Sequence, residues 1–129
     1  MNKEFIPYQQ ALELKELGFD EACFGFWNLM NDNSEWFFDT KIIMNCFNYV
    51  KAPLYQQIFK WFRKNYNLFG CIDLQVCTPP HWFIRIDKII ENDYVYHSED
   101  ENLIFDTYEE AELACLKKLI EIVKQPKKD

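Results

Sequence analysis

The sequence predicts an α+β fold, with an antiparallel sheet of four or five strands and three helices in the order α-β-β-α-β-β-β-α. Three segments show helical spacing of apolar residues, and the runs between them alternate between apolar and polar residues. The chain has only three glycines and no glycine-rich turn, which argues against a parallel nucleotide-binding sheet. At 129 residues it is expected to form a single domain, residues 1–129, with a short basic tail at 124–129.

Two of the helices are predicted in the first half of the chain. The first is expected to begin at Pro7 and to end before Gly18, a residue suited to the left-handed position after a helix. The clearest helix is predicted at residues 52–68, where Pro53 suits the first turn. Its apolar stripe comprises Tyr55, Ile58, Phe59, Phe62 and Tyr66.

The C-terminal helix has the strongest start signal. Thr107 and Glu110 have the spacing of a capping box, in which each side chain satisfies a backbone donor of the first turn. Leu116 and Val123 are expected at the margin of its buried face, and Pro126 is expected to end it. The buried stripe itself is expected to comprise Ala111, Cys115, Leu119 and Ile122.

Short runs with strand character lie between the helices. Their expected ranges are 23–27, 35–39, 72–76, 82–87 and 94–96. Residues 42–50 are also strand-like, but Asn45 and Asn48 weaken the pattern, so whether this segment is a strand stays open. Residues 103–105 form a further short run that could close the sheet.

The charge is negative and unevenly distributed. The net charge is −7, and the stretch from Ile89 to Leu116 holds nine acids and no Lys or Arg. Such a stretch repels nucleic acid and can attract a basic protein surface. An acidic, solvated hairpin followed by the first turn of a helix, where carboxylates are favoured, would explain the same pattern without any partner.

Cysteine usage and the lack of apolar segments indicate the compartment. Five cysteines without a CxxC pair are typical of a reducing environment and buried free thiols. Neither a signal-peptide pattern nor a run of about 18 apolar residues is present. We therefore expect a soluble, cytoplasmic protein with no membrane partner.

No catalytic residue, cofactor or metal site is expected, and the chain is not predicted to be an enzyme. The possible metal ligands, Cys71, Cys77, His81 and His97, lack the closely spaced pairs of structural zinc sites. Cys77, His81 and Asp87 can be drawn as a nucleophile, a base and its orienting acid, but any chain with five cysteines offers such a drawing.

Nucleic-acid binding is the alternative function. It would use the basic and aromatic residues of the central helix, Lys60, Trp61, Arg63 and Lys64. Arg85, Lys88 and the basic tail could assist. The net charge of −7 opposes this reading, because a nucleic-acid footprint usually makes its domain basic.

Three segments carry a resemblance to a known group. FIPYQQALELKELGF, APLYQQIFKWFRKNYNL and DTYEEAELACLKKLIEIVK, in this order, resemble a family of small uncharacterised proteins from Bacteroidetes and their phages and prophages. The resemblance covers about half of the chain and carries no catalytic residue over. It implies a small accessory protein of a mobile element that acts inside a bacterial cell.

These observations lead to one main hypothesis, non-enzymatic protein binding. An acidic face would occlude a basic surface on a host or defence nucleoprotein, as an anti-CRISPR-like inhibitor would. The expected partner-binding residues are Asp93, Tyr94, Tyr96, Glu99, Asp100 and Glu101. A homodimer is also possible, because an exposed strand edge and surplus aromatic residues could pair two copies.

Overall fold

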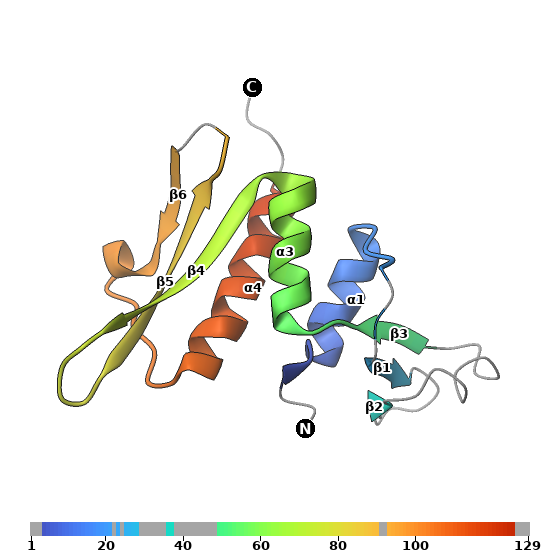
Figure 1. The fold of residues 1–129 in the computed structure, drawn as a ribbon, viewed down its shortest axis with the longest axis horizontal. Coiled ribbons are helices and arrows are strands. Elements are labelled where there is room, and N and C mark those ends of the chain that lie inside the picture. The colour runs from blue at the N-terminus through green and yellow to red at the C-terminus, as the bar shows by residue number, and fades with distance from the viewer. Residues whose placement is uncertain are drawn as a thin grey trace. The chain divides into compact units, whose positions relative to one another are not determined.

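A computed structural model describes residues 4–21, 23, 25–28, 36–37, 49–90 and 93–125. These residues form three α-helices and six strands, all paired antiparallel, so the predicted α+β class is confirmed (Figure 1). The elements are α1 (Tyr8–Glu16), β1 (Gly25–Asn28), β2 (Trp36–Phe37), β3 (Tyr49–Ala52), α3 (Tyr55–Tyr66), β4 (Leu68–Gln75), β5 (His81–Lys88), β6 (Asp93–His97), the 3-10 turn η2 (Ser98–Glu101) and α4 (Tyr108–Lys124).

The described strands form two sheets of three strands, where the sequence predicted one sheet of four or five. Their orders are β2-β1-β3 and β4-β5-β6. The chain correspondingly groups into two compact units, Met1–Ile58 and Phe59–Asp129, with the boundary inside α3. The sequence pattern could not reveal the division, because alternation identifies a strand without identifying its neighbour. A single domain stays a prediction.

In the first unit, α1 ends as its sequence predicts. Gly18 adopts a positive φ of 96°. Its N–H donates to Lys15 O (3.1 Å), and the next N–H, of Phe19, donates to Leu14 O (3.0 Å). This pair of bonds is a Schellman motif, which satisfies carbonyls left over at the helix end. Phe19 is buried beside it, which fixes the direction in which the chain leaves the helix.

The N-terminal segment ties the first unit together. Ile6 N–H donates to Pro53 O (2.8 Å), and Phe5 forms an isolated antiparallel bridge with Leu54. The indole N–H of Trp27 on β1 donates to Ile6 O (2.8 Å). The apolar side chains buried in this unit include Ile6, Ala11, Leu14, Val50, Ala52 and Ile58.

The central helix is shorter than predicted. The residue before a proline is driven toward extended backbone, and Ala52 accordingly belongs to β3 while Pro53 precedes the helix. At the other end, Asn67 takes a left-handed φ of 60° and Leu68 already starts β4. The strand-like segment left open at 42–50 contributes β3 from Tyr49 onward; residues 42–48 lie outside the described part.

In the second unit, α4 packs on β4 and β5 (Figure 1). The closest approach is at Gly70, where an added Cβ would lie 2.9 Å from Cys115 Sγ and 3.2 Å from Leu119 Cδ1. Side chains on one face of a strand recur every second residue, so Ile72 and Leu74 share the α4 face with Gly70. Ile84 and Ile86 of β5 are buried.

The start of α4 is confirmed and its buried face is partly different from the prediction. Thr107 Oγ1 accepts a hydrogen bond from Glu110 N–H (3.1 Å), the first half of the predicted capping box. Leu116 and Ile120 are buried, whereas Ile122 is only half-buried. Because α4 packs against both β4 and β5, its buried face is wider than the single stripe predicted from the sequence. Pro126 lies outside the described residues.

No helix among the described residues combines the length and the apolar character needed to cross a bilayer.

We predict that Gly70→Ala lowers the free energy of unfolding by about 1–3 kcal/mol, because the added methyl group overpacks the β4–α4 contact. Chemical denaturation measures this change. Combining it with Cys115→Ala, which removes the closest atom, should cost less than the sum of the two single changes. If the changes in the free energy of unfolding of the two single variants simply add in the double variant, the contact between residues 70 and 115 does not determine how closely α4 approaches β4.

Candidate protein-binding surface

The predicted partner-binding residues lie on β6 and η2. Glu99, Asp100 and Glu101 are all exposed on the 3-10 turn that follows the strand. Asp93 and Tyr94 belong to β6, but their side chains lie outside the described part of the chain. The structure therefore places three of the expected carboxylates together on one short turn.

Two anchors hold the segment that bears these acids. Ser98, which is 0% exposed, accepts a hydrogen bond at Oγ from the main-chain N–H of Ile84 on β5 (2.9 Å). Phe105 forms an antiparallel bridge with Trp82 at the start of β5, with N–O distances of 2.9 and 2.7 Å. Both anchors lie on β5, the central strand of the sheet, so the acidic turn is attached to the most constrained strand available.

Tyr96 differs from the exposed anchor that the sequence suggested. Its hydroxyl donates to Glu101 Oε2 (2.9 Å), and the Nζ atom of Lys118 lies 4.4 Å from its ring centroid. The side chain is half-buried. These contacts indicate that Tyr96 positions Glu101 more than it offers a surface of its own.

Apolar side chains are exposed within the same segment. Leu103 is 43% and Ile104 46% exposed, and both lie between the acids of η2 and Asp106. A typical protein interface has an apolar centre and a polar rim. The segment from η2 to the first turn of α4 has this composition, which sequence reasoning missed because it concentrated on the charges.

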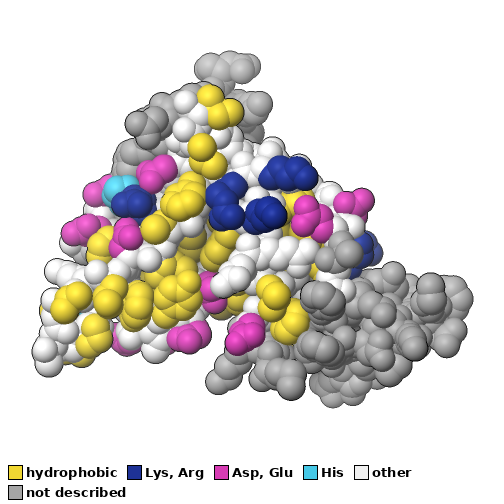
Figure 2. Space-filling view, viewed as in Figure 1, with side chains coloured by type: hydrophobic (Ala, Val, Ile, Leu, Met, Phe, Trp, Pro, Cys, Tyr) yellow, Lys and Arg dark blue, Asp and Glu magenta, His cyan; other side chains and the backbone are white. Residues whose placement is uncertain are grey.

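The aromatic residue of the alternative nucleic-acid site on α3, Trp61, is buried. Trp61 is 7% exposed and its ring packs on Phe62 (5.2 Å between centroids) and Tyr66 (5.3 Å). It is therefore not placed to stack on a base. Lys60 and Lys64 are exposed, and Figure 2 shows basic side chains gathered over the position of α3.

Two other basic residues considered for that alternative, Arg63 and Arg85, make contacts within the protein. The Arg63 guanidinium lies 6.0 Å from the centroid of the Phe69 ring. Arg85 on β5 lies between two carboxylates, 3.5 Å from Asp73 Oδ2 and 3.0 Å from Asp87 Oδ2. The structure thus places Arg85 among acids that largely neutralise it.

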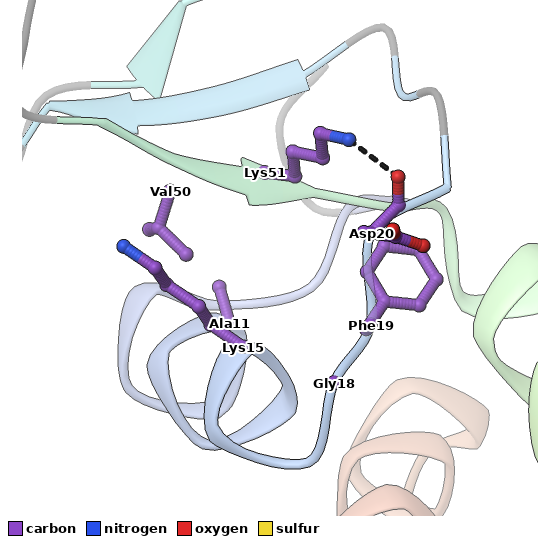
Figure 3. Close-up of a pocket in the computed structure, with 7 residues that line it drawn as sticks. All are labelled: Ala11, Lys15, Gly18, Phe19, Asp20, Val50 and Lys51. Atoms are coloured by element: carbon purple, nitrogen blue, oxygen red, sulfur yellow. Dashed lines mark hydrogen bonds between the residues drawn. The ribbon is translucent and has the colours of Figure 1, made fainter.

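A hollow of ≈ 470 Å³ in the first unit was not foreseen from the sequence. Figure 3 shows the Lys51 side chain reaching Asp20 O (2.5 Å), while Lys15 on α1 points elsewhere. The lining residues are Ala11, Lys15, Gly18, Phe19, Asp20, Val50 and Lys51. They come from separate parts of the sequence and only the fold brings them together, so no local signal could have found them.

Burial makes two cysteines poor nucleophiles. It raises the pKa of the Cys23 thiol from 9.0 to about 11 and that of the Cys115 thiol from 9.0 to about 12. The pKa of Cys71 is also raised, first by burial and then by its contact with Asp73. Cys77 is exposed, and Cys46 lies outside the described residues.

Within the described ranges, no three His, Cys, Asp or Glu side chains lie together in a way that could hold a metal ion. Comparisons of the chain with protein-family models, with curated proteins and with solved structures find no match.

We predict that Ser98→Ala lowers the free energy of unfolding by about 1–3 kcal/mol, because the buried N–H of Ile84 loses its acceptor. Urea denaturation provides the measurement. The neighbouring exposed change Glu99→Ala should alter the same quantity by no more than about 0.5 kcal/mol. Similar losses in both variants would contradict the anchoring role of Ser98.

Thiol reactivity should follow burial. With a maleimide at about pH 8, we expect Cys77 to be modified first among the four cysteines that the structure describes, and Cys23 and Cys115 only as the protein unfolds. A raised pKa leaves less thiolate at that pH, by about a thousandfold for a rise of three units. Mass spectrometry of timed samples measures the order. Rapid modification of Cys115 in the folded protein would show that the β4–α4 contact opens readily.

Proposed function

We propose that the chain acts by binding another protein, without catalysis, through the acidic surface formed by η2, the loop after it and the first turn of α4. The observation that carries the proposal is the exposure of acids and aliphatic side chains together on this segment. The exposed acids Glu99, Asp100, Glu101 and Asp106 flank the exposed Leu103 and Ile104 in the sequence. Fixing the segment at Ser98 and Phe105 reduces the entropy that binding would cost.

The partner that suits this surface is a protein with a basic face. Acids at the rim of an interface chiefly raise the association rate and select against other acidic surfaces. A basic face that normally holds nucleic acid has the required charge, so a host or defence nucleoprotein is the proposed target. Occupying that face would block access of the nucleic acid. This mode of action is compatible with an anti-CRISPR-like accessory protein of a phage or prophage, the context that the resemblance implies.

Direct nucleic-acid binding through α3 is the weaker proposal. Trp61 is buried and Arg85 lies among carboxylates, which leaves Lys60, Arg63 and Lys64 as its basis. Without an exposed aromatic residue, such binding would rest on phosphate contacts alone and would depend strongly on salt.

We predict that neutralising four acids, as E99Q/D100N/E101Q/D106N, reduces capture of the partner about tenfold or more. The tagged protein is incubated with lysate of a Bacteroidetes host, and mass spectrometry quantifies the proteins retained. Raising the salt from about 0.1 M to about 1 M shortens the Debye length from about 10 Å to about 3 Å and should release the same partner.

The matched control E4Q/E16Q/D20N/E121Q removes as much charge from exposed acids elsewhere and should retain the partner. Equal capture by both variants would contradict the proposed surface. Nucleic acid retained by the native chain and lost with R63A/K64A would favour the alternative instead.

A further inference from the structure

Four apolar side chains form a row at the end of the second sheet where α4 begins. Leu74 on β4 pairs with Trp82 on β5, and Trp82 bridges Phe105 on its other side. Directly opposed residues of antiparallel strands project from the same face, so the three side chains are neighbours. The Tyr108 ring packs edge-on against Trp82, 5.3 Å between centroids. We call these four residues the aromatic platform.

The platform lies on the same face of the second sheet that α4 covers nearer Gly70. Gly70, on the same face as Leu74, is in contact with Cys115 and Leu119 of the helix. The helix begins only at Tyr108, so the sheet beyond it is not covered by α4. Leu74 is 45% and Tyr108 42% exposed, and Trp82 and Phe105 are half-buried. A sheet face that is buried along most of its length is therefore left open at this end.

Acids adjoin the platform in the sequence. Asp106 follows Phe105, Glu109 and Glu110 follow Tyr108, and all three are exposed. Burial raises the pKa of the Tyr108 hydroxyl, and the charge of Glu112 raises it further. Figure 2 shows hydrophobic side chains along the arm where Figure 1 places the β4–β5 hairpin, with acidic side chains at its lower margin.

We infer that the aromatic platform is the anchoring site for a cationic, amphipathic segment of the partner protein. A large apolar side chain of that segment would lie on Trp82 and Tyr108, and its lysines or arginines would face Asp106, Glu109 and Glu110. Tryptophan and tyrosine are enriched among residues that dominate binding energies, the contacts packed around them exclude water, and nearby charges select the partner. The inference rests on the proposed function and adds the residues that would provide most of the affinity.

The probe is a pair of synthetic peptides of equal length and charge. One alternates lysine with leucine and phenylalanine, and the other has serine in place of both apolar residues. Fluorescence anisotropy of labelled peptide gives Kd, and amide chemical shifts map the site. We expect the apolar peptide to bind about tenfold more tightly or better, with shifts centred on Leu74, Trp82 and Tyr108.

Leu74→Ser and Tyr108→Ser should each weaken binding of the apolar peptide about tenfold. Ile90→Ser is the matched control, because Ile90 is 84% exposed in the β5–β6 turn away from the platform, and it should leave Kd unchanged. Amide spectra of each variant establish that it is folded. Leu74 is an exposed residue at the end of a strand, so its replacement tests the platform without removing a core side chain.

Three results would overturn the inference. If the serine peptide binds as tightly as the apolar peptide, charge alone provides the affinity. The acidic surface would then remain the proposed binding site, and the platform would have no anchoring role. No binding of either peptide would reject the cationic segment, while the lysate capture still decides the proposed function independently. A dimer in light scattering that Leu74→Ser converts to monomer would assign the platform to a second copy of the chain.

Discussion

The second unit depends on the close approach of α4 to β4 at Gly70. A side chain at that position would occupy the space of Cys115 Sγ, so the absence of a Cβ sets how near the helix can lie. This distance allows Cys115, Leu116 and Leu119 to be 0% exposed. It also fixes where the helix begins relative to the sheet, and thereby brings Tyr108 onto Trp82. The position of the candidate surface is thus a consequence of packing in the core.

β5 organises that surface from the other side. It is the central strand, and its two neighbours satisfy most of its main-chain groups. Three further main-chain groups on it are satisfied by the acidic segment: Ser98 accepts from the N–H of Ile84, and Phe105 bonds both the N–H and the C=O of Trp82. These two anchors involve none of the carboxylates, and Tyr96 separately donates a hydrogen bond to Glu101 Oε2. The identity of the acids can therefore change to suit a partner while the backbone of the segment keeps its attachment.

The features of the fold that could be predicted from the sequence are those encoded by neighbouring residues. The Schellman motif needs only a glycine after the helix, and the cap of α4 needs only Thr107 and Glu110, so both were predictable. The ends of α3 were not, because Ala52 pairs with Gly25 of β1, far away in the sequence. The division into two sheets was missed for the same reason, since it depends on which strands pair.

The candidate site shows the same limit. The exposure of Glu99 to Glu101 follows from their composition, whereas Ser98 in the same run appears equally polar and is fully buried. Only the folded structure shows that the Ser98 hydroxyl accepts a hydrogen bond from the main-chain N–H of Ile84 on β5. The helical pattern places Trp61 among charged residues, yet its side chain is buried. The relevance of Leu74 depends on the strand register, which sets it opposite Trp82.

The two sheets differ in how far apart their paired strands lie along the chain, and this difference bears on the order of folding. Gln75 pairs with His81 across a short hairpin, whereas Asn28 must meet Tyr49 to join β1 to β3. Closing the longer loop costs about 1 kcal/mol more in chain entropy. Sheets built from local pairings form faster than those that require distant ones. We therefore expect the β4–β5 hairpin to form before the first sheet when the full-length chain folds, because β3 must first return to β1 across the longer loop.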